Sequence, residues 1–302
     1  MSLRENHSGK ITTEEAACRL ACDVFDVPEV SDWHVLKKGM TNRSYAFAVE
    51  NQQFIIRAPG EGTEKLIDRR QEAEVYRAIS GLDFCDDPVY INSDTGIKIT
   101  KYLDGVRVCD PYDEDDVTQC MALLRRLHNQ KLSVEHRFDL FGQIDFYEEL
   151  WEGHNSIYSD YTETKKNVFL LKEYIDQQEK DFCLAHIDAV CDNFLFCKDG
   201  LQLTDWEYAG MQDPHIDVAM FCVYSDYSKK SIDRLIDIYF ESGCDRATRV
   251  KIYCYIAACG LLWSNWCEYK HLLGVEFGGY ALRQYRYAED YCKIAMQEMK
   301  KL

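Results

Sequence analysis

The chain has 302 residues, of which 35 are Lys or Arg and 52 are Asp or Glu, so its formal net charge is −17 at pH 7. A negative field of this size repels phosphate backbones, which excludes a simple nucleic-acid binder and disfavours an anionic membrane surface as partner. Hydrophobic residues make up 46% of the sequence and aromatic residues 13%. That composition suffices for a sizeable core in one large domain or two lobes.

Fourteen cysteines are scattered along the chain without a CxxC pair, and the N-terminus resembles no secretory leader. We therefore expect reduced thiols in a cytoplasmic protein. The closest pairs, Cys18 with Cys22 and Cys254 with Cys259, lack the companion ligands that structural zinc requires. The longest apolar stretch, 252–263, is shorter than the about 20 residues of a transmembrane helix, so no membrane insertion is expected.

The first hundred residues predict a small antiparallel sheet accompanied by helices. Residues 12–15 match the capping box that begins a helix, and apolar residues follow at helical spacing. Residues 45–57 hold two β-rich runs on either side of a turn and predict a hairpin. A second helix is predicted at 68–79, and short strands at 89–91 and 97–100.

The character of the sequence changes after Tyr102. Apolar residues between 117 and 127 fall on one helix face, and most of the remaining chain has helical patterns. The exception is 182–204, where short β-type runs are separated by polar loops. We therefore predict an α+β protein of two packed lobes, a small N-terminal sheet lobe over 1–101 and a larger, mainly helical lobe over 102–302.

The densest group of polar residues lies in that exceptional segment and reads HxDxxxxN followed by DxE. Phosphoryl transfer to a hydroxyl needs a carboxylate that orients and deprotonates the acceptor, and oxygen ligands for Mg²⁺. Asp188, Asn193 and Asp205 could supply these groups, because the intervening turn and hairpin would bring them together. Mg²⁺ suits such an oxygen-only set.

Each of these residues taken singly is typical of an ordinary turn, in which Asp and Asn bind their own backbone. Their order, spacing and β-loop-β setting together favour a kinase catalytic loop. Asp188 is then the catalytic base, and His186 orients the loop by hydrogen bonds.

The N-terminal lobe would then hold the nucleotide. Residues 37–42 could cradle phosphates with backbone N–H groups, although such a loop is also typical of a plain connection between strands. Arg57 ends the second strand of the hairpin, where kinases place a phosphate-contacting cation, and Glu72 in the next helix could pair with it. The alternative is a surface ion pair. Arginine here departs from the usual lysine but keeps the charge and binds bidentately.

The chain resembles the choline kinases, most closely the bacterial type that supplies phosphocholine to cell-surface glycans. This resemblance covers the chain nearly end to end. HxDxxxxN alone is shared with aminoglycoside phosphotransferases, whereas the other motifs are narrower. The matching stretches are GMTN (39–42), GTEKLIDR (62–69), the loop 186–194, LTDWEYAG (203–210), DPHIDVA (213–219) and the tryptophan pair at 263 and 266.

The resemblance implies a protein-kinase-like fold, the cofactors ATP and Mg²⁺, and transfer of the γ-phosphoryl group to the hydroxyl of choline. A protein substrate is improbable because DxE replaces the DFG motif and no APE-like segment follows. By position in the motifs, the resemblance assigns Asp188 as the base, Asn193 and Asp205 as the magnesium ligands, and Arg57, Glu72, Thr41, Asn42 and Tyr102 as the ATP-binding residues.

An aromatic group could recognise the trimethylammonium head. Trp263 and Trp266 share a helix face, and Phe277 and Tyr280 follow within another turn or two. Such a head cannot donate hydrogen bonds, so aromatic faces and a nearby carboxylate bind it. By spacing alone the stripe is typical of a core. The resemblance implies substrate binding by Trp263, Trp266 and Phe277, with Tyr227 as a weaker candidate and Glu207 as the anion.

Two alternatives stay open. A related small-molecule kinase could act on ethanolamine or an aminoglycoside, whose primary ammonium groups require hydrogen-bonding carboxylates. A non-catalytic, pseudokinase-like binding module is the other, and it is less favoured because every group that phosphoryl transfer requires has a candidate. The partner is thus a small molecule, and the sequence does not indicate the oligomeric state.

Overall fold

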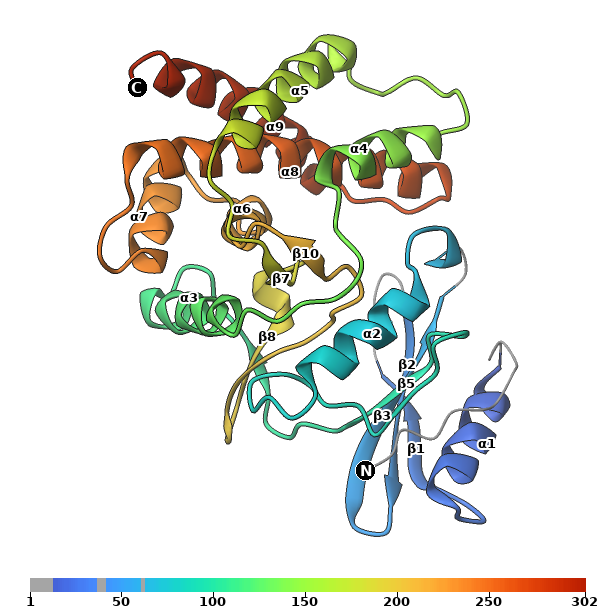
Figure 1. The fold of residues 1–302 in the computed structure, drawn as a ribbon. Coiled ribbons are helices and arrows are strands. Elements are labelled where there is room, and N and C mark those ends of the chain that lie inside the picture. Colours follow the sequence, from blue (N-terminus) through green and yellow to red (C-terminus); the bar gives the residue numbers. More distant parts are fainter. Residues whose placement is uncertain (1–12, 37–41, 61–62) are drawn as a thin grey trace. The chain divides into compact units, whose positions relative to one another are not determined.

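The computed structural model describes residues 13–36, 42–60 and 63–302, and the chain divides into two compact units (Figure 1). The first unit runs to Val108 and also takes in Phe194–Ala209. The second unit comprises Cys109–Asn193 and Gly210–Leu302. One unit is built around sheets and the other around helices, as the sequence predicts.

The first unit is built on a five-stranded antiparallel sheet. Its strands β2 and β3 form the predicted hairpin, with Tyr45 opposite Ile56. The strand next to β2 was not predicted; its five residues are mostly exposed and do not alternate in burial. In spatial order the sheet consists of β1 (Ser31–Val35), β2 (Asn42–Val49), β3 (Gln52–Pro59), β5 (Lys98–Lys101) and β4 (Tyr90–Ile91).

Helix α1 (Glu14–Phe25) packs on this sheet and closes its core. The hydroxyl oxygen of Thr13 accepts a hydrogen bond from the backbone N–H of Ala16 at 3.2 Å, so the predicted N-terminal cap is confirmed. Leu20 on the helix joins Phe54 and Ile56 on β3 in one buried cluster. Side chains along a strand alternate between the two faces of the sheet. The side chains next to Phe54 and Ile56 in the sequence of β3 therefore point to the face opposite this cluster.

Helix α2 (Arg69–Ile79) supplies the side chains that contact the opposite face of the sheet. The carboxylate of Asp68 caps it, accepting from the backbone N–H groups of Arg70 and Gln71. Arg57 on β3 lies opposite Lys98 on β5 in the ladder, so their side chains share one face of the sheet. Both make contacts with α2 side chains.

A small three-stranded sheet completes the first unit, in the order β6 (Arg107–Val108), β8 (Phe194–Cys197), β9 (Gly200–Leu203). Leu203 donates its backbone N–H to the carbonyl of Phe84 at 2.8 Å, which ties this sheet to the earlier part of the unit. The division therefore differs from the predicted boundary between 101 and 102. Strand pairing carries the 194–209 hairpin away from its neighbours in sequence, which periodicity alone does not reveal.

The second unit is mainly helical and centres on α8 (Arg246–Leu272), which is buried along most of its length. Gly260 lets α9 (Gly279–Met299) approach closely, since a Cβ there would lie 2.7 Å from the carbonyl oxygen of Gln284. A two-stranded ladder of β7 (Cys183–Ala185) and β10 (Gly210–Gln212) carries the loop described below. The other helices are α3 (Glu114–Asn129), α4 (Leu140–Glu149), α5 (Tyr161–Gln177), α6 (His215–Tyr224), α7 (Lys229–Tyr239) and α9 (Gly279–Met299).

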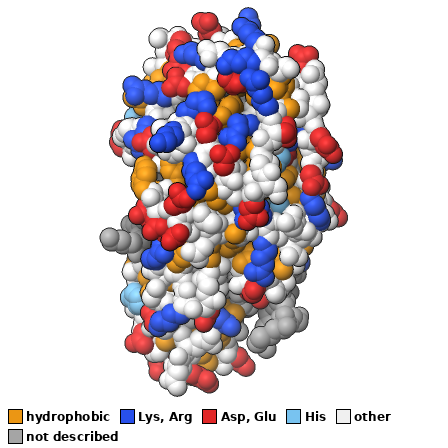
Figure 2. Space-filling view, turned by 90° about the vertical axis from the view of Figure 1, so that its left-hand side faces the viewer, with side chains coloured by type: hydrophobic (Ala, Val, Ile, Leu, Met, Phe, Trp, Pro, Cys, Tyr) orange, Lys and Arg blue, Asp and Glu red, His pale blue; other side chains and the backbone are white. Residues whose placement is uncertain are grey.

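Over the parts of the chain that the structure describes, no helix is both long and apolar enough to span a bilayer. All fourteen cysteines are free thiols, in agreement with the expected reduced state. On the face drawn in Figure 2, cationic and anionic side chains are interspersed, and apolar side chains gather only in small groups. This face therefore carries charged side chains of both signs.

Candidate active site

The loop after β7 is anchored by a buried carboxylate. Asp217 is fully buried and accepts hydrogen bonds from the backbone N–H groups of His186 at 2.8 Å and Ile187 at 2.7 Å. Its Oδ2 also lies 2.9 Å from Nε2 of His128. These contacts fix the start of the loop. Asp217 lies in the matched DPHIDVA stretch, but sequence reasoning gave it no role because its partners are remote in sequence.

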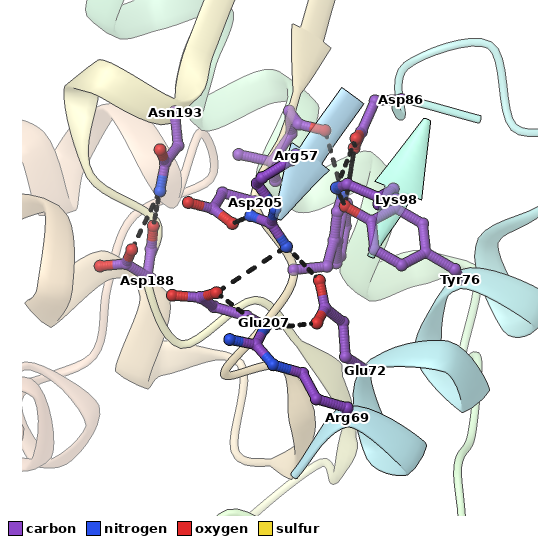
Figure 3. Close-up of polar contacts among 12 residues, drawn as sticks. Arg57, Arg69, Glu72, Tyr76, Asp86, Lys98, Asp188, Asn193, Asp205 and Glu207 are labelled. Carbon is purple, nitrogen blue, oxygen red and sulfur yellow. Dashed lines mark hydrogen bonds and ion pairs between the residues drawn. The ribbon is translucent and has the colours of Figure 1, made fainter. Parts of the chain in front are cut away.

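Asp188 and Asn193 meet across the predicted four-residue turn. The amide nitrogen of Asn193 donates to the Asp188 backbone carbonyl at 2.9 Å and to its carboxylate Oδ2 at 3.1 Å (Figure 3). A short 3₁₀ turn, η2 (Cys191–Asn193), brings the two together. The backbone of Ile187 has φ +69°, which side chains other than glycine rarely adopt. The loop therefore holds its carboxylate in one orientation.

In the first unit, Arg57 lies among three carboxylates. Its guanidinium forms ion pairs with Glu72 on α2 and with Asp205 after β9 (Figure 3). The predicted pairing of Arg57 with Glu72 is confirmed, and it is not the surface pair of the alternative interpretation, because the exposed fractions of these side chains are 12% and 1%. Asp205 itself has φ +68°.

A second arginine extends this network. Arg69 lies 2.7 Å from Glu72 and 3.2 Å from Glu207, and Glu207 lies 3.8 Å from Arg57. Burial opposes the charge on Arg57, but its carboxylate neighbours outweigh this and raise its pKa. Burial and the charge of Asp205 raise the pKa of Glu207. The network thus holds a permanent cation at the strand end, where a phosphate chain could bind.

A buried lysine lies beside this network and was missed by sequence reasoning. Lys98 donates to the Asp86 carboxylate at 3.0 Å and to the hydroxyl of Tyr76, and its ammonium lies 4.1 Å from the centre of the Tyr76 ring (Figure 3). Tyr76 and Glu72 are neighbours on one face of α2. Lys98 therefore fixes the helix that carries Glu72. The available signal was the place of Lys98 inside the strand predicted at 97–100.

Two of the three remaining predicted nucleotide residues, Asn42 and Tyr102, lie at strand ends. Asn42 opens β2, is buried and lies opposite Pro59 in the ladder. Thr41 lies outside the described residues. Tyr102 follows β5 and donates its backbone N–H to the carbonyl of Gln53 at 2.9 Å. The roles of Thr41, Asn42 and Tyr102 in nucleotide binding stay predictions.

The predicted aromatic residues of the second unit form a continuous group. The ring centres of Trp263 and Trp266 are 5.8 Å apart at an interplanar angle of 86°. Phe277 lies 5.1 Å from Trp266, and Tyr280 lies 6.4 Å from Phe277. Burial raises the pKa of Tyr280, and the charge of Asp188 adds to the rise. Tyr280 also lies 6.0 Å from Tyr224, whose hydroxyl donates to Asp192 in the catalytic loop, so the group reaches this loop within the same unit.

Two predicted substrate residues have other partners. Tyr227 hydrogen-bonds through its hydroxyl to the Pro111 carbonyl, and its ring lies 6.1 Å from Tyr112 and 6.2 Å from Phe221. These contacts tie Tyr227 to the chain before α3. Glu207 is ion-paired with two arginines, which offset its charge. For both residues, substrate binding stays a prediction.

The donor atoms fit a hard divalent cation in kind. Asn193 uses its amide nitrogen toward Asp188, so the ligand atom that this side chain offers is Oδ1, and Asp205 offers carboxylate oxygens. Few carboxylates plus substrate phosphates are typical of Mg²⁺ sites. Asn193 belongs to the second unit and Asp205 to the first, so their joint role as ligands stays a prediction.

Comparison with known proteins defines the class of this chain. The model of the phosphotransferase enzyme family matches residues 32–253, which is well over half of the sequence. The chain therefore belongs to the phosphotransferase enzyme family. Its fold is kinase-like and α+β, as predicted.

Three similar proteins, two of them solved structures, carry the name LicA. Protein LicA of Haemophilus influenzae is 28% identical over 267 residues, covering 82% of this chain and 76% of its own. The crystal structure of choline kinase LicA from Streptococcus pneumoniae matches with a TM-score of 0.79 and 27% identity, covering 91% of this chain and 98% of that one. A structure of LicA in complex with AMP matches with a TM-score of 0.78 and 26% identity, covering 95% of this chain and 100% of that one.

Proposed function

We propose that this protein is an ATP-dependent choline kinase, which transfers the γ-phosphoryl group of ATP to the hydroxyl of choline and releases ADP. The observation that carries the proposal is the continuity of the aromatic group with the Asp188 loop inside one compact unit. The likeness to a protein named choline kinase and to a LicA complex with AMP supports it.

The catalytic loop supplies the proton acceptor. The choline hydroxyl oxygen attacks the γ-phosphorus, its proton passes to the carboxylate of Asp188, and the bond from phosphorus to the bridging oxygen of ADP breaks. Asn193 orients the carboxylate by donating to its Oδ2. Because the loop start is pinned by Asp217, little reorganisation is needed when the alcohol binds.

The first unit binds the nucleotide in this proposal. Arg57, held by Glu72, and the loop with Thr41 and Asn42 contact the phosphates, while Tyr102 flanks the adenine. Asn193 and Asp205 hold Mg²⁺, which neutralises charge on the phosphates when it is bound. The guanidinium of Arg57 exchanges part of its contact with Asp205 for the phosphate oxygens, because both are anions competing for the same donors.

The aromatic group accounts for the acceptor. A trimethylammonium group has no N–H to donate, so it gains most from ring faces, each worth about 0.5 to 2 kcal/mol when desolvated. Trp263 and Trp266 are 7% and 5% exposed, so their faces lie in a medium of low dielectric constant. Ring faces do not replace the hydrogen bonds that a primary ammonium such as that of ethanolamine gives up on leaving water.

The test is an acceptor panel with purified protein, ATP and Mg²⁺, in which ADP release is followed by a coupled assay. We expect ADP release to rise strongly with choline and less with ethanolamine or an aminoglycoside. If ethanolamine or an aminoglycoside is turned over faster than choline, that compound is the preferred acceptor and the choline assignment is wrong. ADP release that no alcohol accelerates, despite ATP binding, would favour a binding module.

The free thiols agree with a cytoplasmic location, which belongs to the same proposal.

A further inference from the structure

A second carboxylate of the catalytic loop is tied to the aromatic group. Asp192 lies in η2, one residue before Asn193, and its side chain is exposed. Its Oδ2 accepts a hydrogen bond from the hydroxyl of Tyr224, the last residue of α6. Neither residue has a role in phosphoryl transfer as described above. This hydrogen bond holds the Asp192 carboxylate beside the proposed acceptor site. That carboxylate takes no part in the proton transfer.

Tyr224 continues the aromatic group toward the loop. Its ring lies edge-on to Tyr280, with centres 6.0 Å apart and an interplanar angle of 65°. Tyr280 is in turn the neighbour of Phe277, which contacts Trp266. An unbroken series of rings thus runs from the tryptophans to Asp192. All of these residues belong to the second unit.

Asp188 belongs to the same catalytic loop as Asp192. Burial raises the pKa of both Tyr224 and Tyr280, and the charge of Asp188 contributes to each rise. Asn193, the residue after Asp192, donates its amide N–H to the Asp188 carboxylate Oδ2 at 3.1 Å, so the carboxylates of Asp188 and Asp192 belong to one short turn. The attacking alcohol and the polar end of the ring series must occupy the same region.

We propose that Asp192, held by Tyr224, is the fixed anion that selects a cationic acceptor. The inference rests on the proposed function and adds a specificity residue to it. Asp188 cannot serve alone, because accepting the hydroxyl proton removes its negative charge during the reaction. Glu207, the anion that the sequence suggested, is offset by Arg57 and Arg69. Asp192 accepts no proton in the proposed transfer, and its hydrogen bond comes from a neutral phenol.

The test compares choline with its neutral carbon isostere, 3,3-dimethylbutan-1-ol. Both have the same shape, so the ratio of their kcat/KM values measures charge recognition alone. In Asp192→Asn the hydrogen bond from Tyr224 persists while the charge is lost. We expect this ratio to fall roughly fivefold to tenfold, through a higher KM for choline with kcat largely kept. If the isostere is not turned over, its inhibition constant replaces its KM.

Two further variants separate charge from structure. Tyr224→Phe keeps the ring but releases the carboxylate, so we expect a smaller fall in the ratio and no further fall when it is added to Asp192→Asn. Asp290→Asn removes an exposed carboxylate from α9 and serves as the matched control, with the ratio unchanged.

An unchanged ratio in Asp192→Asn, or equal losses for both alcohols, would overturn the inference while leaving choline phosphorylation intact. A wild-type protein that does not phosphorylate choline would instead overturn the proposed function and the inference with it.

Discussion

Ile187 and Asp205, which flank the proposed chemistry, both hold left-handed backbone conformations, with φ of +69° and +68°. Such conformations cost on the order of 1 to 3 kcal/mol each and persist only where the surroundings enforce them. At Ile187 the enforcing group is Asp217, which binds its N–H. At Asp205 it is the ion pair with Arg57. Each polar anchor thus stabilises the backbone that presents a reactive carboxylate.

Asp188→Asn tests the proton acceptor directly. We expect turnover to fall by about 10²- to 10⁴-fold, because an amide cannot take the hydroxyl proton. ATP affinity, measured by titration calorimetry, should change little because the proposed phosphate contacts lie on Arg57. Unchanged turnover would mean that the active site lies elsewhere.

Phe277→Leu tests the aromatic group without opening a cavity. Phe277 is only partly buried, and leucine keeps most of its volume while removing the ring face. We expect kcat/KM for choline to fall roughly threefold to tenfold, and kcat/KM for ethanolamine to fall less. Steady-state kinetics with both acceptors checks this. Equal losses for the two acceptors would contradict recognition by ring faces.

Among single residues, the sequence predicts the reacting groups better than the residues that hold these groups in place. Asp188 and Asn193 are predicted because their spacing is local, and the structure joins them. Asp217 and Tyr224 support the same loop from 31 and 32 residues away in sequence. No local pattern distinguishes them from other helical residues, so their contacts emerge only from the fold.

Among the elements, the contact of α8 with α9 depends on one missing side chain. A Cβ at Gly260 would lie 2.8 Å from both the backbone nitrogen of Ala288 and Cβ of Tyr287. Gly260→Ala should therefore lower the free energy of unfolding by about 1 to 3 kcal/mol, even though alanine favours helices. Chemical denaturation checks this.

The matched control is Gly279→Ala at the start of α9. Its Cβ would meet only the end of the flexible Arg283 side chain at 3.1 Å. We expect a change smaller than about 1 kcal/mol there. A Gly260→Ala protein as stable as the control would show that the two helices separate without cost.

The first residue of α6 gives the fold a pH dependence. Burial lowers the pKa of His215 from its ordinary value of 6.5 to about 4, although Asp213 at 3.4 Å opposes the shift. The folded protein thus binds this proton less readily than the unfolded chain. Its stabilising contribution is complete above pH 6.5 and is lost as the pH falls toward 4.

Between pH 7 and pH 5 we expect the free energy of unfolding to fall by about 2 kcal/mol from this residue. His215→Gln cannot be protonated, so its stability should vary less over the same range. Urea denaturation at several pH values measures both proteins. Parallel curves for the two proteins would contradict the assigned role of His215.

The helices and the main hairpin were predictable from periodicity, and β4, β5, β7, β8 and β9 coincide with predicted β-type runs. Strands β1, β6 and β10 were not predicted. Thr13 caps its helix within the predicted stretch 12–15, and Asp68 caps the helix that the sequence predicts at 68–79. Strands β6 and β10 have only two and three residues. Runs of this length carry no measurable alternation, and their pairing is decided by tertiary contacts.

For the whole molecule, the net charge of −17 favours cationic acceptors over anionic ones. The two compact units separate the proposed tasks, with Arg57 and its carboxylates in one and the Asp188 loop with its aromatic group in the other. A kinase reaction requires both, since the phosphates and the alcohol come from different binding sites.

The most direct test of the account is to identify the phosphorylated product. Purified protein is incubated with ATP, Mg²⁺ and choline, and phosphorus-31 NMR and mass spectrometry follow the reaction. We predict that phosphocholine accumulates in equal amount with ADP. Inorganic phosphate appearing in place of phosphocholine, or no transfer to choline while ethanolamine is phosphorylated, would contradict the account.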